Sequence, residues 1–189
     1  MMIKNETLSV IKNRRSIRAY KEEQITDEEL QAVLEAGLYA PSAMNQQCWH
    51  FTILQNKEIM NQISESSKLV AKTFDNEHLQ KLANNEKFHI YYGAPTVIII
   101  SGEEKALMSD VDCAAATENM LLAAEAIGLG ACWINFTRFA FASDKAEYYR
   151  KTLAIPEGYS PFYSITLGYK KVETLNAPPR KENIVNYVK

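Results

Sequence analysis

Three arginines and a serine lie within five residues near the start of the chain, in the segment Arg14-Arg15-Ser16-Ile17-Arg18. In an extended backbone, Arg14, Ser16 and Arg18 point to the same face, because successive side chains of a strand alternate. Two guanidinium forks and a hydroxyl on one face can converge on a single anion, and a phosphate is the natural occupant. The alternative is a solvated basic strip, and the segment alone does not decide between the two.

A second polar segment has the sequence APSAMNQQCW and starts at residue 40. Ser42, Asn45 and Gln47 offer the donors and acceptors that pair with the polar edge of a uracil-like ring. Pro41 makes this loop rigid. The alternative is a polar loop that ends a helix, with Trp49 buried in the core.

The elements that position these two segments follow from the spacing of apolar and capping residues. Leu8 and Ile11 predict a short helix, after which residues 14–18 become extended. Thr26 and Glu29 have capping-box spacing, and the apolar periodicity that follows continues until a proline ends it. This second helix therefore delivers Pro41 and Ser42 at its end.

The middle of the chain alternates between strand and helix patterns. Residues 50–54 predict a strand, and Asn56 can cap a helix that runs to about Ser66. Residues 67–87 are polar and helix-prone, and we expect mobile helices over a site there. The β-branched run from Pro95 to Ser101 is apolar on both faces, which predicts a buried central strand.

The longest predicted helix covers about 109–127 and is apolar on nearly all sides, which implies burial in the centre or at a subunit interface. Gly128 and Gly130 end it. The remaining pattern predicts a strand over 131–134, a helix capped by Ser143 that runs to about Ala154, a strand over 160–169, and an extended tail over about 171–189. The order of these elements indicates an α+β fold.

Length and composition bound the class of protein. A chain of 189 residues, 47% of them hydrophobic, fits one compact domain over 1–189. The net charge of −2 gives no reason to expect nucleic acid or an anionic membrane surface as a partner. The start does not resemble a signal peptide, no apolar run approaches the roughly 20 residues of a membrane span, and three cysteines without CxxC spacing favour a reducing cytoplasm. The histidines and cysteines have no metal-ligand spacing.

Four motifs together resemble the FMN-dependent nitroreductase family. They are RRSIRxY near the start, APSxxNxQxW after the second helix, AxxIGLGxCWI, and an LGY…PxR ending. They occur in the family's order and cover nearly the entire chain. The resemblance implies a three-layer α-β-α fold, in which helices flank a mixed, mostly antiparallel central sheet and a long buried helix lies at a dimer interface.

The resemblance also implies roles for the basic residues. Arg14 and Ser16 match the residues that hold the FMN phosphate, with a further contact from Arg15. Arg180, in the Pro-Pro-Arg segment, matches a late arginine that joins Arg14 there; its alternative is a solvated charge on the tail. Arg18 matches the basic residue beside the flavin O2 and N1 edge, where a positive charge favours the anionic reduced flavin.

Other matched residues imply a site shared by two chains. Pro41, Ser42, Asn45 and Gln47 match the loop that reaches the flavin from the partner subunit, which implies a homodimer with FMN at the interface.

A third matched segment, Trp133, Ile134 and Asn135, runs beside the isoalloxazine ring in the family. For Trp133, packing in the core is an equal alternative. Two departures from the family are Cys48, where proline is usual, and Asn135, where glycine is common; Asn135 leaves the clearance for substrate in doubt.

The implied activity is hydride transfer from NADH or NADPH through the flavin to small electron-poor acceptors, such as nitroaromatics, quinones or flavins, in two stages at one site. No side chain is assigned as acid or base, because the flavin N5 performs the chemistry, and no metal is expected. Two alternatives stay open. One is a flavoenzyme of the same fold with another substrate, such as a reductive dehalogenase or a ring oxidase; the other is an FMN-binding redox sensor or store without turnover.

Overall fold

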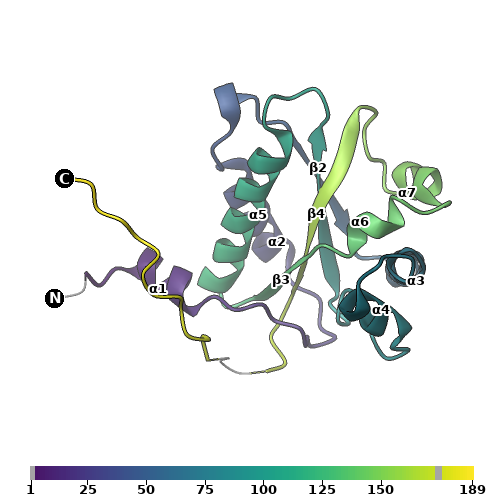
Figure 1. The fold of residues 1–189 in the computed structure, drawn as a ribbon, viewed down its shortest axis with the longest axis horizontal. Coiled ribbons are helices and arrows are strands. Elements are labelled where there is room, and N and C mark those ends of the chain that lie inside the picture. The colour runs from purple at the N-terminus through teal and green to yellow at the C-terminus, as the bar shows by residue number, and fades with distance from the viewer. Residues whose placement is uncertain (1–2, 173–175) are drawn as a thin grey trace.

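An antiparallel sheet lies between two layers of helices in the computed structural model, which describes residues 3–172 and 176–189 (Figure 1). Among these residues, four strands form the sheet in the order β1-β2-β4-β3. They are β1 (Trp49–Leu54), β2 (Thr96–Glu103), β3 (Gly130–Ile134) and β4 (Tyr159–Gly168). The one parallel pairing in the described part of the chain is an isolated bridge between Ser16 and Ala131. The predicted α+β, three-layer architecture is confirmed.

The helices divide between the two faces of the sheet. On one side lie α2 (Asp27–Leu38) and α5 (Ser109–Ala126), with α1 (Glu6–Asn13) against the outer side of α5 (Figure 1). On the other side lie α3 (Lys57–Ala71), α6 (Thr137–Ala140) and α7 (Ala146–Thr152), and α4 (Glu77–Asn84) packs on α3. None of the helices within residues 3–172 and 176–189 has the length and apolarity that a bilayer crossing requires.

Strand β2 shows why the sheet is covered on both faces. Ile98 and Ile100 belong to the core beneath α2 and α5, whereas Val97 and Ile99 belong to the core beneath α3, α6 and α7. All four side chains are fully buried. A strand with two buried faces needs apolar residues at every position, and the predicted central strand is therefore confirmed.

Side-chain caps start two of the predicted helices. Thr26 Oγ1 accepts the Glu29 N–H at 3.2 Å, and Glu29 Oε2 accepts the Thr26 N–H at 2.8 Å, so the capping box is complete. Asn56 Oδ1 accepts the Ile59 N–H at 3.1 Å at the start of α3. The structure extends α3 beyond the predicted end at Ser66, because the Ser66 hydroxyl is buried and bonded to the Tyr149 hydroxyl at 2.7 Å.

Two predictions about the segment after β3 were wrong or incomplete. Ser143 does not cap α7, which begins at Ala146; the Ser143 hydroxyl instead accepts the Lys145 N–H at 3.2 Å within a turn. Helix α6 was not predicted, since four residues are too few to show a helical period. Its Thr137 hydroxyl hydrogen-bonds with the Ser164 hydroxyl at 2.6 Å, so a tertiary contact holds this turn on β4.

The end of the chain has no helix or strand in its described part. Residues 176–189 are exposed and run past α1 away from the sheet (Figure 1). Of the tail predicted over about 171–189, residues 173–175 lie outside the described residues.

Candidate functional site

The arginine-rich segment lies along the free edge of strand β3. The Ile17 N–H donates to the Ala131 carbonyl at 2.9 Å, next to the Ser16–Ala131 bridge. The Tyr20 hydroxyl lies 2.6 Å from the Ile17 carbonyl and 2.7 Å from Thr166 Oγ1 on β4, so it ties the segment to the sheet. The extended conformation predicted for residues 14–18 is thus formed, with Ile17 buried and its neighbours facing outward.

Arg14 and Arg15 make different contacts. Arg14 Nε lies 3.3 Å from Glu118 Oε1 on α5, which is close enough for an ion pair. The two groups are not aligned for a hydrogen bond, so this buried Nε has no acceptor among the described residues. Arg15 Nη1 donates to the Lys12 carbonyl at 2.8 Å and the Arg14 carbonyl at 2.6 Å, which stabilises the end of α1.

Ser16 and Arg18 face two different neighbours. Burial raises the pKa of the Cys132 thiol, although a hydrogen bond from Ser16 and the nearby charges of Arg18 and Arg14 oppose this rise. The guanidinium carbon of Arg18 lies 5.8 Å from the centre of the Tyr92 ring, within cation–π range. The structure therefore adds Tyr92 to the candidate site, and no spacing in the sequence links this residue to Arg18.

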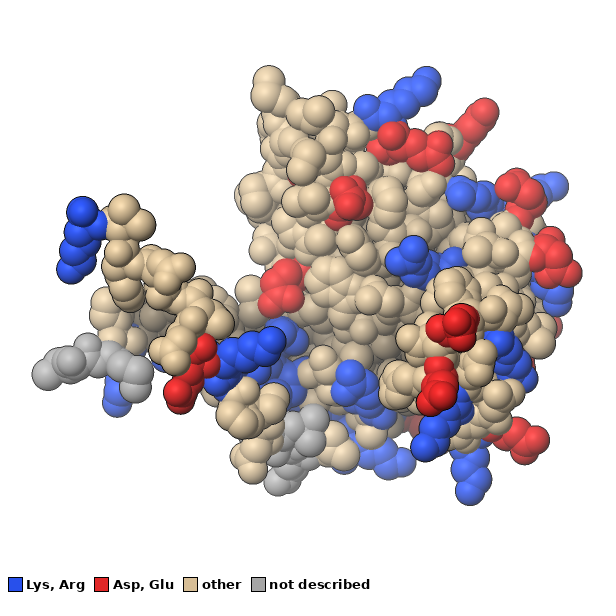
Figure 2. Space-filling view, in the orientation of Figure 1, with Lys and Arg blue, Asp and Glu red and all other residues tan. Residues whose placement is uncertain are grey.

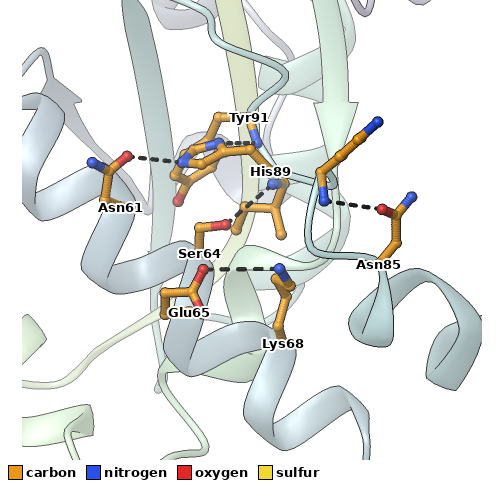
Figure 3. A network of polar contacts seen from close by, with 9 residues as sticks. Asn61, Ser64, Glu65, Lys68, Asn85, His89 and Tyr91 are labelled. Carbon is orange, nitrogen blue, oxygen red and sulfur yellow. Dashed lines mark hydrogen bonds and ion pairs between the residues drawn. The ribbon is translucent and has the colours of Figure 1, made fainter.

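A polar network fixes the segment that carries Tyr92 against α3 (Figure 3). His89 Nδ1 accepts the Tyr91 N–H at 3.2 Å, so Nε2 carries the ring proton and donates to Asn61 Oδ1 at 3.2 Å. Ser64 Oγ accepts the Ile90 N–H at 3.3 Å. Burial lowers the pKa of His89, which agrees with this neutral tautomer.

The helices predicted within residues 67–87 are present as the end of α3 and as α4. Ile90 and Tyr91, which follow them, are buried in the core under α3 and α6. The mobility expected for this region stays a prediction.

The loop over residues 41–47 is built around a short 3₁₀ turn, Ala43–Asn45. Ser42 Oγ accepts the Gln47 N–H at 3.0 Å, and Gln47 Nε2 donates to Asn45 Oδ1 at 3.0 Å. Met44, Asn45 and Gln47 have positive φ angles of 53°, 56° and 47°. A non-glycine residue in this left-handed region costs about 1–3 kcal/mol, so the loop needs contacts that hold it. Pro41, at the start of the loop, is exposed.

Helix α5 separates this loop from the arginine-rich segment. The loop contacts Asp112 in the first turn of α5, whereas Arg14 contacts Glu118. These two acidic residues are about 9 Å apart along the helix axis, at about 1.5 Å per residue. Figure 1 shows the same arrangement, with the short 3₁₀ turn Ala43–Asn45 beyond one end of α5 and α1 near the other. The two predicted segments therefore contact different turns of α5 in this chain.

The predicted ring-flanking residues differ in their surroundings. Trp133 is half-buried, and its ring packs against Tyr163 edge to face with centroids 4.8 Å apart. Its Nε1 is buried without an acceptor among the described residues. Ile134 is buried on the opposite face of β3, and Asn135 is exposed directly after the strand. The contact with Tyr163 fits the core alternative for Trp133.

Arg180 lies in the exposed tail. Within the described part of the chain, no hydrogen bond or ion pair joins it to Arg14. Its place at the phosphate stays a prediction. No three metal-binding side chains gather at one point among residues 3–172 and 176–189.

Comparison with known proteins identifies the family. The nitroreductase family model matches residues 11–169. An Archaeoglobus fulgidus protein named "Putative NADH dehydrogenase/NAD(P)H nitroreductase" is 36% identical over 174 residues, which cover 89% of this chain and 87% of that protein.

Two crystal structures of nitroreductases with bound FMN are similar over nearly the whole fold. The Bacteroides fragilis protein has a TM-score of 0.89 and 37% identity, covering 98% of this chain and 100% of its own. The Desulfitobacterium hafniense protein has a TM-score of 0.90 and 32% identity, covering 99% and 100%.

The three cysteine thiols are predicted to be unreactive in the folded protein. Cys48, Cys113 and Cys132 are buried, and burial raises the pKa of each, that of Cys113 to about 12. Because the thiolate is the reactive form, we expect slow labelling by Ellman's reagent at pH 8 and rapid labelling of all three thiols in guanidinium chloride. Fast labelling of the native protein would contradict this expectation.

Proposed function

Because the chain belongs to the nitroreductase family, we propose that it binds FMN and reduces small electron-poor molecules with electrons from NADH or NADPH. The observation that carries this proposal is Arg14, whose buried Nε lies 3.3 Å from Glu118 Oε1 but forms no hydrogen bond with any described residue. Two further arginines and a serine lie beside it in the sequence. Such a set fits a phosphate, which supplies several acceptor oxygens. The bound FMN of two similar structures supports the same cofactor.

The chain's own residues would hold the two ends of the cofactor differently. Arg14 and Ser16 would bind the phosphate, with a contact from Arg15 and, from the tail, Arg180. Arg18 would lie beside the O2 and N1 edge of the ring, held by its contact with Tyr92. A fixed guanidinium there stabilises negative charge on that edge.

An FMN held by these residues would supply the redox chemistry at its N5, accepting hydride from the nicotinamide and giving electrons to the acceptor. Trp133, Ile134 and Asn135 would flank the ring, and the exposed Asn135 is the member of this set that an incoming molecule would meet. No side chain is assigned as acid or base. Donor and acceptor would use the same face in turn, so the protein's part is to bind and orient them.

The proposed site needs two chains. The loop that carries Pro41, Ser42, Asn45 and Gln47 contacts the first turn of α5, whereas Arg14 lies beside the middle of that helix. In a homodimer this loop would complete the partner's site. The surface beside that loop is largely uncharged (Figure 2) and exposes Leu38, Tyr39, Met44, Leu107, Met108 and Val111. The tail exposes Ile184, Val185, Tyr187 and Val188. Exposed apolar area of this extent marks a protein interface.

The proposed activity is tested by the spectrum of the purified protein and its response to nicotinamides. The yellow colour of an oxidised flavin should bleach when NADH or NADPH is added without oxygen, and it should return when a quinone or nitroaromatic is added. Colour without bleaching would favour the redox sensor or store. Bleaching with reoxidation only by halogenated or ring substrates would favour another flavoenzyme of this fold.

Replacing Arg14 should weaken FMN binding. Arg14→Ala removes a charged hydrogen-bond donor, and we expect a loss of about 1.5–3 kcal/mol, which is roughly 10- to 150-fold in the dissociation constant. Fluorescence titration of the apoprotein with FMN measures this. Lys12→Ala is the matched control, because it removes one exposed positive charge two residues earlier. Equal effects of both variants would reduce the role of Arg14 to general electrostatic attraction.

A mixed dimer tests whether two chains share the site. Arg14→Ala and Asn45→Ala chains carrying different tags are coexpressed, and dimers with both tags are isolated. If the loop serves the partner, one of the two sites in this hybrid is intact, and it should bind about one FMN per dimer with wild-type affinity. A hybrid in which both sites are weak would place the loop and the arginines in the same chain's site.

A further inference from the structure

One buried carboxylate contacts the loop over residues 41–47 near its start and also contacts Cys48, the residue that follows the loop. The Ala43 N–H points between the two carboxylate oxygens of Asp112, 3.1 Å from each. At the other end, the Cys48 thiol donates to Asp112 Oδ2 at 3.6 Å. Asp112 is only 5% exposed. The carboxylate of Asp112 therefore links the start of the loop to Cys48 through hydrogen bonds.

The surroundings of Asp112 fix the position of its carboxylate. The residue lies in the first turn of α5, an 18-residue helix, where the helix dipole favours a negative charge. The helix is packed tightly on β2, because a Cβ at Gly102 would come within 2.8 Å of Cys113 Sγ and closer still to the Ser109 hydroxyl, both on α5. The carboxylate is therefore fixed to the sheet through α5.

The loop depends on such a fixed contact. Met44, Asn45 and Gln47 hold left-handed backbone angles, and the exposed Met44 side chain offers little packing to maintain them. Hydrogen bonds from Gln47 to Ser42 and Asn45 lie within the loop itself. A second outside contact, in which Gln46 Oε1 accepts the Leu107 N–H at 3.0 Å, is on the exposed surface. The Cys48 carbonyl accepts the Glu103 N–H of β2 at 2.9 Å after the turn, and Asp112 supplies the buried side-chain contact at its start.

We propose that Asp112 is a positioning residue, which holds the loop in the one conformation that presents Ser42, Asn45 and Gln47 to the partner chain's flavin site. This inference rests on the proposed function. Asp112 touches neither the arginine-rich segment of its own chain nor, in the proposed arrangement, the cofactor. Its effect on cofactor binding therefore passes through the loop to the other chain. The Cys48 thiol is a second hydrogen-bond donor to the Asp112 carboxylate.

The first test compares two carboxylates in the same helical turn. Asp112→Ala should weaken FMN binding to the apoprotein at least tenfold and speed hydrogen exchange at the Ala43 amide by a similar factor. The amide of Ile99, in the core of β2, should exchange as in the wild type. Asp110→Ala is the matched control, because Asp110 is exposed and makes no hydrogen bond to the loop. We expect its FMN affinity and Ala43 exchange to stay within twofold of the wild type.

The second test separates positioning from a loss of folding. In a hybrid dimer of Asp112→Ala and Arg14→Ala chains, positioning across the interface leaves one intact site, which should bind about one FMN per dimer with wild-type affinity. If Asp112 acted only through its own chain's fold, both sites of this hybrid would be weak. That result would overturn the proposal.

A change in the loop supplies an independent variant if Asp112→Ala fails to fold. Ala43→Pro removes the N–H that the carboxylate accepts, and Ser42 before it is already extended, as a residue before proline prefers. This variant should weaken FMN binding as much as Asp112→Ala does. In a hybrid dimer with Arg14→Ala chains, it should likewise leave one site with wild-type affinity.

Wild-type affinity and wild-type Ala43 exchange in Asp112→Ala would refute the positioning role alone. A wild-type protein that binds no FMN would refute the proposed function instead.

Discussion

The backbone hydrogen bond from Ile17 to Ala131 sets the position of the arginine-rich segment, and the candidate site depends on it. Once this bond and its neighbouring bridge align the segment with β3, strand geometry alternates the side chains. Ile17 turns into the core, while Arg14, Ser16 and Arg18 face outward from the sheet edge. The Tyr20 hydroxyl then prevents the segment from sliding along the strand, because it contacts both Ile17 and Thr166.

Helix α5 organises the other half of the site. Asp112 in its first turn contacts the loop over residues 41–47, and Glu118 in its middle contacts Arg14. Small residues on its remaining faces allow the sheet and α2 to approach closely. One helix thus fixes the spacing between the two proposed binding segments, and in the proposed homodimer a two-fold axis would bring each loop to the partner's arginines.

The sequence predicted those features that depend on local chemistry. The capping box of Thr26 and Glu29 forms as expected, because it depends on hydrogen bonds between residues three apart in sequence. Strand β2 forms as expected because its apolar residues occupy both faces of the strand. Tertiary contacts decided the rest. The extension of α3, the turn at Ser143 and the position of Tyr92 all depend on partners distant in sequence. The contacts of Asp112 also depend on residues distant in sequence, and the signal available for it was an acidic residue in the first turn of a helix with apolar residues on nearly all sides.

The burial of all three thiols has a consequence for how the protein resists oxidation of its cysteines. Reduced flavins that meet dioxygen release hydrogen peroxide, and peroxide attacks cysteines in proportion to their thiolate character and exposure. Cys48, Cys113 and Cys132 are enclosed and kept protonated, so a chain that carried such a cofactor would not convert them to sulfenic acids or cross-links. The packing that builds the core would thereby also shield these thiols from peroxide.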